Sequence, residues 1–276
     1  MNMATMENGT NTTKTVLMVA PTGSRYMKAD HPSIPLSPRE IAAEVAACVE
    51  AGASVAHLHA RGPDGRSTQD PEVYREIIQR IRDVTDVVIQ LSIGAKGFTV
   101  DEALRPLVLE PEMASLPMRN VATQPDEVHQ MAAAMKQHQV IPSVDASSVA
   151  MLESAAGLHR AGVFPAPLCL GFILGEPATR EDTEARLRSF AALAPARAFW
   201  WCAKGGAFAA DAATLALGMG GHLRTGLEDV VPGEGQPAVG NVKLVQRAAA
   251  LSRRLGRETA TAAEVRAMFV AARSGG

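Results

Sequence analysis

The sequence predicts an α/β protein built as a single (β/α)8 barrel (TIM barrel) with an extra C-terminal helix. Strand-like and helix-like segments alternate over the 276 residues, and this alternation is typical of a parallel sheet covered by helices. No Pro- or Ser-rich linker separates two halves of the chain, and its length is normal for one barrel. A doubly wound sheet is the alternative arrangement for the same alternation.

The strands are predicted from eight short apolar segments that are bounded by turn-forming or polar residues. Continuous apolar segments of this kind are typical of strands that are buried on both faces of a parallel sheet. The predicted strands are residues 15–20, 53–59, 87–92, 113–116, 140–145, 168–174, 198–203 and 221–225.

The helix starts are predicted from capping patterns. Ser37 is followed by Pro38 and Glu40, which gives an N-cap, a proline in the first turn and a capping-box glutamate. Thr261 and Glu264 repeat the capping box ahead of the C-terminal helix. The predicted helices begin at Ser37 (ending at Gly52), Asp70, Gln124 and Ala178, and span residues 147–161, 240–256 and 261–272.

Composition limits the possible classes of function. The formal net charge of −2 gives no support to a nucleic-acid or membrane surface, and Gly, Pro, Arg or Asp interrupts every apolar stretch before it reaches membrane-spanning length. Residues 1–13 are polar and are expected to form a flexible tail, with residues 14–276 as one catalytic domain. Cys48, Cys169 and Cys202 each lie in an apolar segment, so we expect reduced core cysteines in a cytoplasmic protein.

The strongest chemical signal is the pair His57 and His59 at the end of the second predicted strand. Alternate side chains of a strand share a face, so both imidazoles point the same way, at the end where parallel barrels place their active sites. Two neutral imidazoles suit a divalent metal such as zinc, which takes a third protein ligand and keeps an open position for catalysis. A hydrogen-bonded pair of core histidines is the alternative.

The eighth strand and the turn after it supply two adjacent carboxylates. Glu228 completes a two-histidine, one-carboxylate metal site, and Asp229 is then free to act as a general base. Arg224, a few residues earlier, is expected to orient Asp229 and keep it ionised. A solvated Glu-Asp pair at a helix start is the alternative. Other polar residues that follow the strands are expected at the same mouth of the barrel: Thr22, Ser24, Arg25, Ser92, Ser115, Asp145 and Lys204.

Several stretches together resemble the β-keto acid cleavage enzyme family, typified by 3-keto-5-aminohexanoate cleavage enzyme. The matching stretches include AGASVAHLHAR around the histidine pair and GGHLRTGLED around the carboxylates. The full set is residues 35–41, 51–61, 90–94, 111–116, 220–229, 240–245 and 256–261. The resemblance implies a (β/α)8 enzyme that exchanges a β-keto acid with acetyl-CoA, giving acetoacetate and a new acyl-CoA. It also implies a homo-oligomer, specifically a homotetramer.

The resemblance also implies roles for particular residues. His57, His59 and Glu228 hold one Zn²⁺ per subunit, and Asp229, supported by Arg224, removes the substrate proton. Ser92 and Ser115 match hydroxyl positions that line the family's pocket and would hydrogen-bond the substrate carboxylate or developing oxyanions.

Several positions depart from the family pattern and bear on the substrate, among them residues 118–122, Ala207 and the three named in the next sentences. Asp145 stands where the family commonly has a glutamate, and Lys204 replaces a glycine. Arg25 stands where the aminohexanoate enzyme has a glutamate that meets the substrate's amino group. A guanidinium pairs with a carboxylate and repels an ammonium, so we expect a dicarboxylic β-keto acid. Arg25 contacting a CoA phosphate, an acidic neighbour or solvent is the alternative.

Two other classes of function remain possible from the residues alone. One is a metal-dependent barrel lyase, aldolase or hydrolase that forms an enolate without CoA. The other is a non-catalytic barrel that serves as a binding module, which the intact His57, His59, Glu228 and Asp229 argue against. A serine hydrolase is not expected, because no Gly-x-Ser-x-Gly motif is present.

Overall fold

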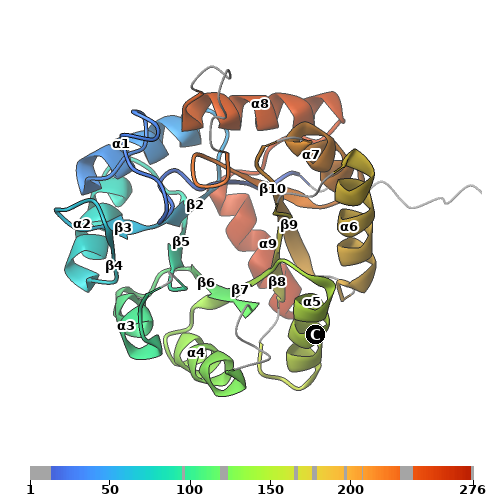
Figure 1. The fold of residues 1–276 in the computed structure, drawn as a ribbon, viewed down its shortest axis with the longest axis horizontal. Coiled ribbons are helices and arrows are strands. Elements are labelled where there is room, and N and C mark those ends of the chain that lie inside the picture. The colour runs from blue at the N-terminus through green and yellow to red at the C-terminus, as the bar shows by residue number, and fades with distance from the viewer. Residues whose placement is uncertain are drawn as a thin grey trace, which may run out of the picture.

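The computed structural model describes residues 14–94, 97–118, 124–164, 167–175, 179–195, 198–206, 208–230 and 239–274. Within these residues eight strands close a barrel in the order β1-β10-β9-β8-β7-β6-β5-β2, and every neighbouring pair is parallel (Figure 1). The closed barrel confirms the predicted fold and rules out the doubly wound alternative, which has open sheet edges. The predicted tail, residues 1–13, lies outside the described residues.

All eight barrel strands overlap the apolar segments identified in the sequence. Most of their side chains are buried, because helices cover the outside of the barrel and side chains fill its inside. The strands are β1 (Leu17–Val19), β2 (Val55–Leu58), β5 (Val88–Ser92), β6 (Met113–Pro117), β7 (Ile141–Ala146), β8 (Cys169–Ile173), β9 (Phe199–Ala203) and β10 (His222–Thr225). A short antiparallel hairpin, β3 (Ala60–Arg61) with β4 (Ser67–Thr68), follows β2 and was not among the predicted strands.

Helices form a ring around the barrel (Figure 1). Ser37 and Glu40 form the predicted capping box at α1, and Asp70 caps α2 through the Glu72 N–H. The ring consists of α1 (Pro38–Glu50), α2 (Pro71–Arg82), α3 (Val100–Leu104) with the 3₁₀-helix η1 (Arg105–Leu109), α4 (Pro125–Gln137), α5 (Val149–Arg160), α6 (Arg180–Leu193), α7 (Ala209–Gly218) and α8 (Asn241–Arg254). None of the helices in the described ranges is both long and apolar enough to cross a membrane.

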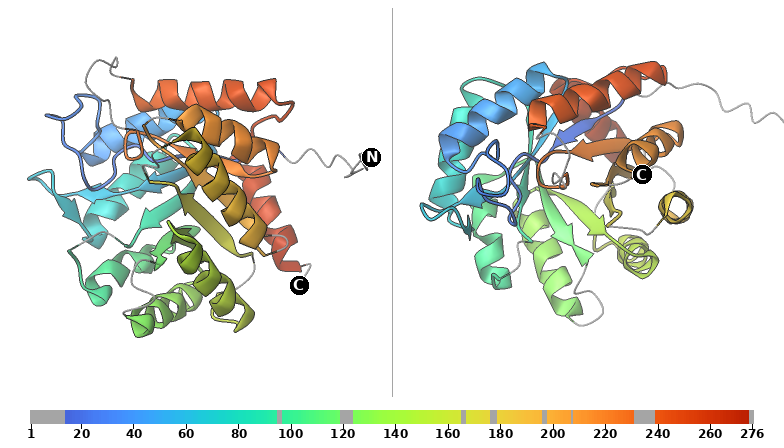
Figure 2. Two further views of the ribbon diagram at one scale, coloured as in Figure 1. Left: turned by 45° about the vertical axis from the view of Figure 1, so that its right-hand side comes forward. Right: turned by 45° about the horizontal axis from the view of Figure 1, so that its top comes forward.

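The predicted extra helix, α9 (Ala262–Ser274), lies across the amino-terminal end of the barrel (Figures 1 and 2). Val265 and Phe269 of α9 pack on side chains that point into the barrel from the starts of its strands, among them Met18 and Val88. The Thr261 and Glu264 capping box is formed, with each backbone N–H donating to the other side chain. The helix therefore seals this end, and the carboxyl ends of the strands are left for chemistry.

The three cysteines are buried and unpaired, as predicted. Cys48 lies on α1, Cys169 on β8 and Cys202 on β9, so no two of them are on the same element. Burial raises the pKa of Cys48 and of Cys202 to about 12, so both thiols stay protonated at neutral pH. They act as small apolar side chains.

Candidate active site

A cavity of about 410 Å³ opens at the carboxyl ends of the strands, and this volume suits a small organic molecule. It brings together ten of the twelve site residues that the sequence predicted. They are Ser24, Arg25, His57, His59, Ser92, Ser115, Asp145, Arg224, Glu228 and Asp229. Side chains from β2, β5, β6, β7 and β10 thus converge, as expected when parallel strands end at one mouth.

His57 and His59 share one face at the end of β2, as strand alternation predicts. Their Nε2 atoms lie 3.2 Å apart, and both side chains are buried. Two imidazole nitrogens this close require a proton or a cation between them, since two lone pairs would repel each other.

Gln90 determines how His57 can interact. The two residues are paired in register on β2 and β5, and Nδ1 of His57 lies 2.6 Å from Oε1 of Gln90. A carbonyl oxygen only accepts, so Nδ1 carries the hydrogen and Nε2 is left with a lone pair. Burial lowers the pKa of His57 to about 3, so the ring is neutral at physiological pH. Neutral imidazole is the form that binds metals.

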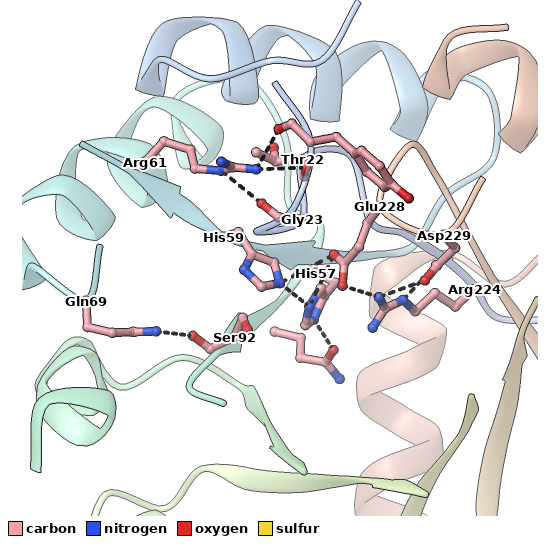
Figure 3. Close-up of polar contacts among 12 residues, drawn as sticks. Thr22, Gly23, His57, His59, Arg61, Gln69, Ser92, Arg224, Glu228 and Asp229 are labelled. Carbon is pink, nitrogen blue, oxygen red and sulfur yellow. Dashed lines mark hydrogen bonds and ion pairs between the residues drawn. The ribbon is translucent and has the colours of Figure 1, made fainter. Parts of the chain in front are cut away.

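Glu228 brings a carboxylate to the same point (Figure 3). Its Oε2 lies 3.6 Å from Nε2 of His57 and 3.4 Å from Nε2 of His59. This oxygen is buried and has no hydrogen-bond partner among the described residues. One donor atom from each of the three residues lies within 4.8 Å of the others. Two imidazoles and an otherwise unsatisfied carboxylate oxygen around one point fit a divalent cation, and this set is typical of catalytic zinc.

Arg224 binds both carboxylates (Figure 3). Its Nε and Nη2 donate to the two oxygens of Asp229 at 2.9 and 3.0 Å, and Nη2 also donates to Oε1 of Glu228. Burial opposes the charge of both acids. For Glu228, chiefly the Arg224 guanidinium outweighs burial and holds the pKa well below the usual value. For Asp229 burial prevails over Arg224 and, with the nearby Glu228 charge, raises the pKa. The two neighbouring acids therefore differ in proton affinity, as separate ligand and base roles require.

Two glycines let the carboxylate turn approach β1. Gly226 has φ +151°, and a Cβ there would lie 2.1 Å from the carbonyl oxygen of Ala20. Gly23 has φ +61°, and a Cβ there would lie 2.7 Å from Cγ of Glu228. Larger residues at either position would push Glu228 away from the histidines.

Ser92, Ser115 and Asp145 line the opposite side of the cavity from β5, β6 and β7. Ser92 is paired in register with Ser115, so their side chains share the interior face. The carbonyl of Ser92 accepts hydrogen bonds from Nε2 of Gln69 at 3.1 Å and from the hydroxyl of Tyr74 at 3.0 Å. These two bonds fix the end of β5 where its serine faces the cavity.

The structure does not bring Thr22 and Lys204 to this cavity. Thr22 is fully buried, and only its carbonyl has a partner among the described residues, Nη2 of Arg61 at 3.4 Å. Lys204 lines a second cavity outside the barrel, between α7 and α8. Lys204 therefore lies apart from the cavity that holds the ten residues above.

Two residues that were not assigned a role in the sequence support the site. Gln90 orients His57, and its signal is a polar side chain within the otherwise apolar strand β5. Arg61 is buried, and its guanidinium donates to the carbonyls of Gly23 and Tyr26 at 2.9 and 3.0 Å. These bonds hold the loop that carries Ser24 and Arg25 over the cavity.

Comparison with known proteins places this site in a family. A model of the β-keto acid cleavage enzymes matches residues 14–270. The chain belongs to this family. It is 33% identical over 267 residues to 3-oxoadipate:acetyl-CoA acetyltransferase of Cupriavidus necator, covering 92% of this chain and 94% of the relative. It is 34% identical over 264 residues to 3-keto-5-aminohexanoate cleavage enzyme of Fusobacterium nucleatum, covering 92% and 96%.

Solved structures resemble this β-keto acid cleavage enzyme in fold. A ternary complex of ObcA with a C4-CoA adduct and oxalate superposes with a TM-score of 0.73 over 86% of this chain and 67% of that chain. Its sequence identity is 19%, so the likeness concerns the barrel and not its chemistry. The family assignment confirms the resemblance identified in the sequence.

Proposed function

We propose that this family member is a zinc-dependent acyltransferase that exchanges a β-keto acid with acetyl-CoA, giving acetoacetate and a new acyl-CoA. The observation that carries the proposal is the juxtaposition of a candidate metal set with a separate, arginine-bound carboxylate, Asp229, in one cavity. The names of the Cupriavidus and Fusobacterium relatives support the reaction class.

His57, His59 and Glu228 would hold one zinc ion per subunit. Oε2 of Glu228, which accepts no hydrogen bond from the described residues, and the Nε2 lone pair of His57 support this assignment. When bound, the ion polarises the ketone of the keto acid and makes the neighbouring CH₂ more acidic.

Asp229 is the proposed base. It takes a proton from the CH₂ between the ketone and the carboxylate of the substrate, while Arg224 holds its two oxygens in place. The substrate carbon then attacks the thioester carbonyl of acetyl-CoA, and the CoA thiolate leaves. The thiolate adds to the original ketone carbon, and the bond between that carbon and the former CH₂ carbon breaks. The proton returns from Asp229 to the released carbon, so the products are acetoacetate and the new acyl-CoA.

The remaining lining residues would bind and orient the substrate. Ser92 and Ser115 are placed to donate hydrogen bonds to a substrate carboxylate or to a developing oxyanion. Burial opposes the charge of Arg224, but Asp229 and Glu228, with a smaller contribution from Asp145, outweigh it and raise the pKa of Arg224. Ser24 and Arg25 close the side of the cavity nearest the loop after β1.

Arg25 would select the far end of the substrate. It is exposed at the cavity lining, and its guanidinium carbon lies 4.9 Å from the centre of the Tyr26 ring, which holds the group without neutralising it. A carboxylate at the far end of the keto acid would pair with this guanidinium. The name of the Cupriavidus relative, which specifies 3-oxoadipate, is consistent with a dicarboxylic substrate.

We also propose a homotetramer, which light scattering of the purified protein tests.

The decisive experiment incubates the zinc-loaded protein with a panel of β-keto acids, with and without acetyl-CoA, followed by mass spectrometry. The proposed exchange gives one acyl-CoA and acetoacetate in equal amounts, and only when acetyl-CoA is present. Cleavage of a keto acid without the thioester would instead establish the lyase or hydrolase alternative. Zinc binding without turnover of any keto acid would favour the non-catalytic barrel.

A further inference from the structure

A second cavity, which we call the α7–α8 crevice, lies outside the barrel wall next to the candidate active site. Its volume is about 460 Å³. Its floor is the outer side of β9 and β10, its walls are α7 and α8, and Lys204 lies at its edge. Ala209, Ala210 and Ala213 form the α7 wall, and these short side chains leave the space between the two helices open.

Positive charge predominates in the α7–α8 crevice. Lys204, Arg247 and Arg254 line it, and among the described residues neither arginine forms an ion pair. The one acid in the lining, Asp211, is already neutralised, since its Oδ1 lies 3.1 Å from Nη2 of Arg180. A crevice with this balance favours an anion with several charges.

The proposed reaction uses such an anion, because acetyl-CoA carries several phosphate charges. The active-site cavity of about 410 Å³ has room for a keto acid and a thioester end, but not for a whole CoA molecule with its phosphates. The phosphates must therefore bind elsewhere. The cavity bounded by α1, α2 and the β3–β4 hairpin is lined by one arginine, Arg61, and three carboxylates, so it lacks the excess of positive charge that the α7–α8 crevice has.

The α7–α8 crevice is close enough to serve the active site. Arg224 lines both cavities. Gly205, next to Lys204, packs so tightly on the carboxylate turn that a Cβ at this position would lie 1.6 Å from the backbone oxygen of Asp229. The strand end that carries Lys204 therefore contacts the turn that carries Asp229, and the two cavities are neighbours. In (β/α)8 barrels, the loops after the seventh and eighth strands, here β9 and β10, are frequent phosphate sites, and Lys204 lies in the first of them. Arg247 and Arg254 extend the lining of the crevice farther along α8.

We propose that the α7–α8 crevice binds the phosphate groups of acetyl-CoA, with the pantetheine arm reaching from the crevice into the active-site cavity to place the thioester beside Asp229. Arg247 and Arg254 are the proposed phosphate-binding residues, and Lys204 adds charge at the edge of the crevice. The inference rests on the proposed function, because it assumes a CoA thioester as co-substrate.

The test compares acetyl-CoA with acetyl-pantetheine, which carries the same thioester without the nucleotide. An Arg247→Met, Arg254→Met double variant should raise KM for acetyl-CoA by about tenfold or more, as expected for the loss of charge-assisted hydrogen bonds. KM for acetyl-pantetheine and for the keto acid should not change. Arg253→Met is the matched control, since Arg253 is an exposed α8 arginine that does not line the crevice. Arg247→Lys should restore part of the affinity.

Two results would overturn the inference. One is an unchanged KM for acetyl-CoA in the double variant, and the other is an equal rise in KM for both thioesters. If Arg25→Met alone raises KM for acetyl-CoA, the phosphates bind at the loop after β1 instead. Calorimetry measures the binding of CoA without turnover, so it tests the phosphate site independently of the proposed reaction. CoA should bind the wild type at least tenfold more tightly than pantetheine, and the double variant should lose that difference whether or not turnover occurs.

Discussion

Oε1 of Gln90 lies 2.6 Å from Nδ1 of His57, and this contact directs the other nitrogen of the ring toward Glu228. The amide of Gln90 is buried, and its Nε2 has no described partner. Leaving a buried N–H₂ group unsatisfied costs about 1–3 kcal/mol. Gln90 therefore lowers the stability of the fold at this position. We infer that its function is to orient His57.

Gln90→Leu should weaken zinc binding by about 10- to 100-fold, the usual effect of removing a group that orients a metal-binding histidine. Competition with a chelator measures this affinity without reference to turnover. Gln69→Leu is the matched control, because it removes another buried glutamine near the cavity that contacts Ser92 and not a histidine. Equal zinc affinity in the Gln90 and Gln69 variants would contradict the role of Gln90.

His57→Ala and His59→Ala should each remove the metal and all turnover while the barrel stays folded, since the core does not depend on either ring. Metal analysis and circular dichroism of the purified variants test both parts. Full zinc occupancy in the double variant would show that the metal binds elsewhere.

Asp229→Asn should retain zinc and substrate binding but slow the reaction by roughly two to four orders of magnitude, the usual range for a positioned acid or base. The amide cannot accept the substrate proton, although it can still accept a hydrogen bond from Arg224. Exchange of the substrate α-protons with deuterated solvent, followed by NMR, isolates this step. Near-normal exchange would mean that another group is the base.

Arg25→Glu should change the order of preference among substrates. The wild type is expected to prefer a dicarboxylic β-keto acid to a neutral one, and a neutral acid to a cationic one, because a guanidinium attracts a carboxylate and repels an ammonium. The variant should reverse this order. The measurement is kcat/KM on all three classes. An unchanged order, or a wild-type preference for the cationic acid, would refute the idea that Arg25 selects the charge.

His222 should make the protein less stable in acid. It is buried in β10, where Nδ1 accepts the Val16 N–H at 3.1 Å, and burial lowers its pKa to about 3. Below pH 6.5 the unfolded chain binds a proton that the folded chain does not bind until about pH 3. Stability is therefore lost as the pH falls through this window. Between pH 7 and pH 5 the loss is about 2 kcal/mol for this residue.

The measurement for His222 is the free energy of unfolding in urea at pH 7 and at pH 5. His222→Gln lacks a titrating ring, so its pH 7 to pH 5 difference should be about 2 kcal/mol smaller than that of the wild type, even if it is less stable at both. Identical differences would show that His222 does not control this dependence.

Much of the site could be predicted because strand alternation is a local rule. His57 and His59 are two residues apart on one strand, so their common face follows from sequence spacing alone. The capping boxes at Ser37 and Thr261 are local in the same way. Glu228 was predicted to lie near the two histidines because it follows the last strand, which closes the barrel beside β1.

The positions that were not predicted depend on information beyond one strand. The partnership of Gln90 with His57 depends on the register between β2 and β5, which neither strand encodes by itself. Lys204 is two residues after Cys202 and lines the same crevice, so its direction depends on which face of β9 is turned outward, and one strand does not encode this. The β3–β4 hairpin is only two residues long on each strand, too short for any periodicity.

The helix α9 also constrains the order in which the barrel can be completed. Its packing on Met18 joins the final segment of the chain to the first strand, and the Ala260 N–H donates to the Thr15 carbonyl at 2.8 Å. During synthesis the strands emerge before α9, so the apolar floor of the barrel stays exposed to water until α9 has been made. A ribosome that stalls between β10 and α9 would therefore expose the apolar amino-terminal end of the barrel, and chaperones bind apolar surface of this kind.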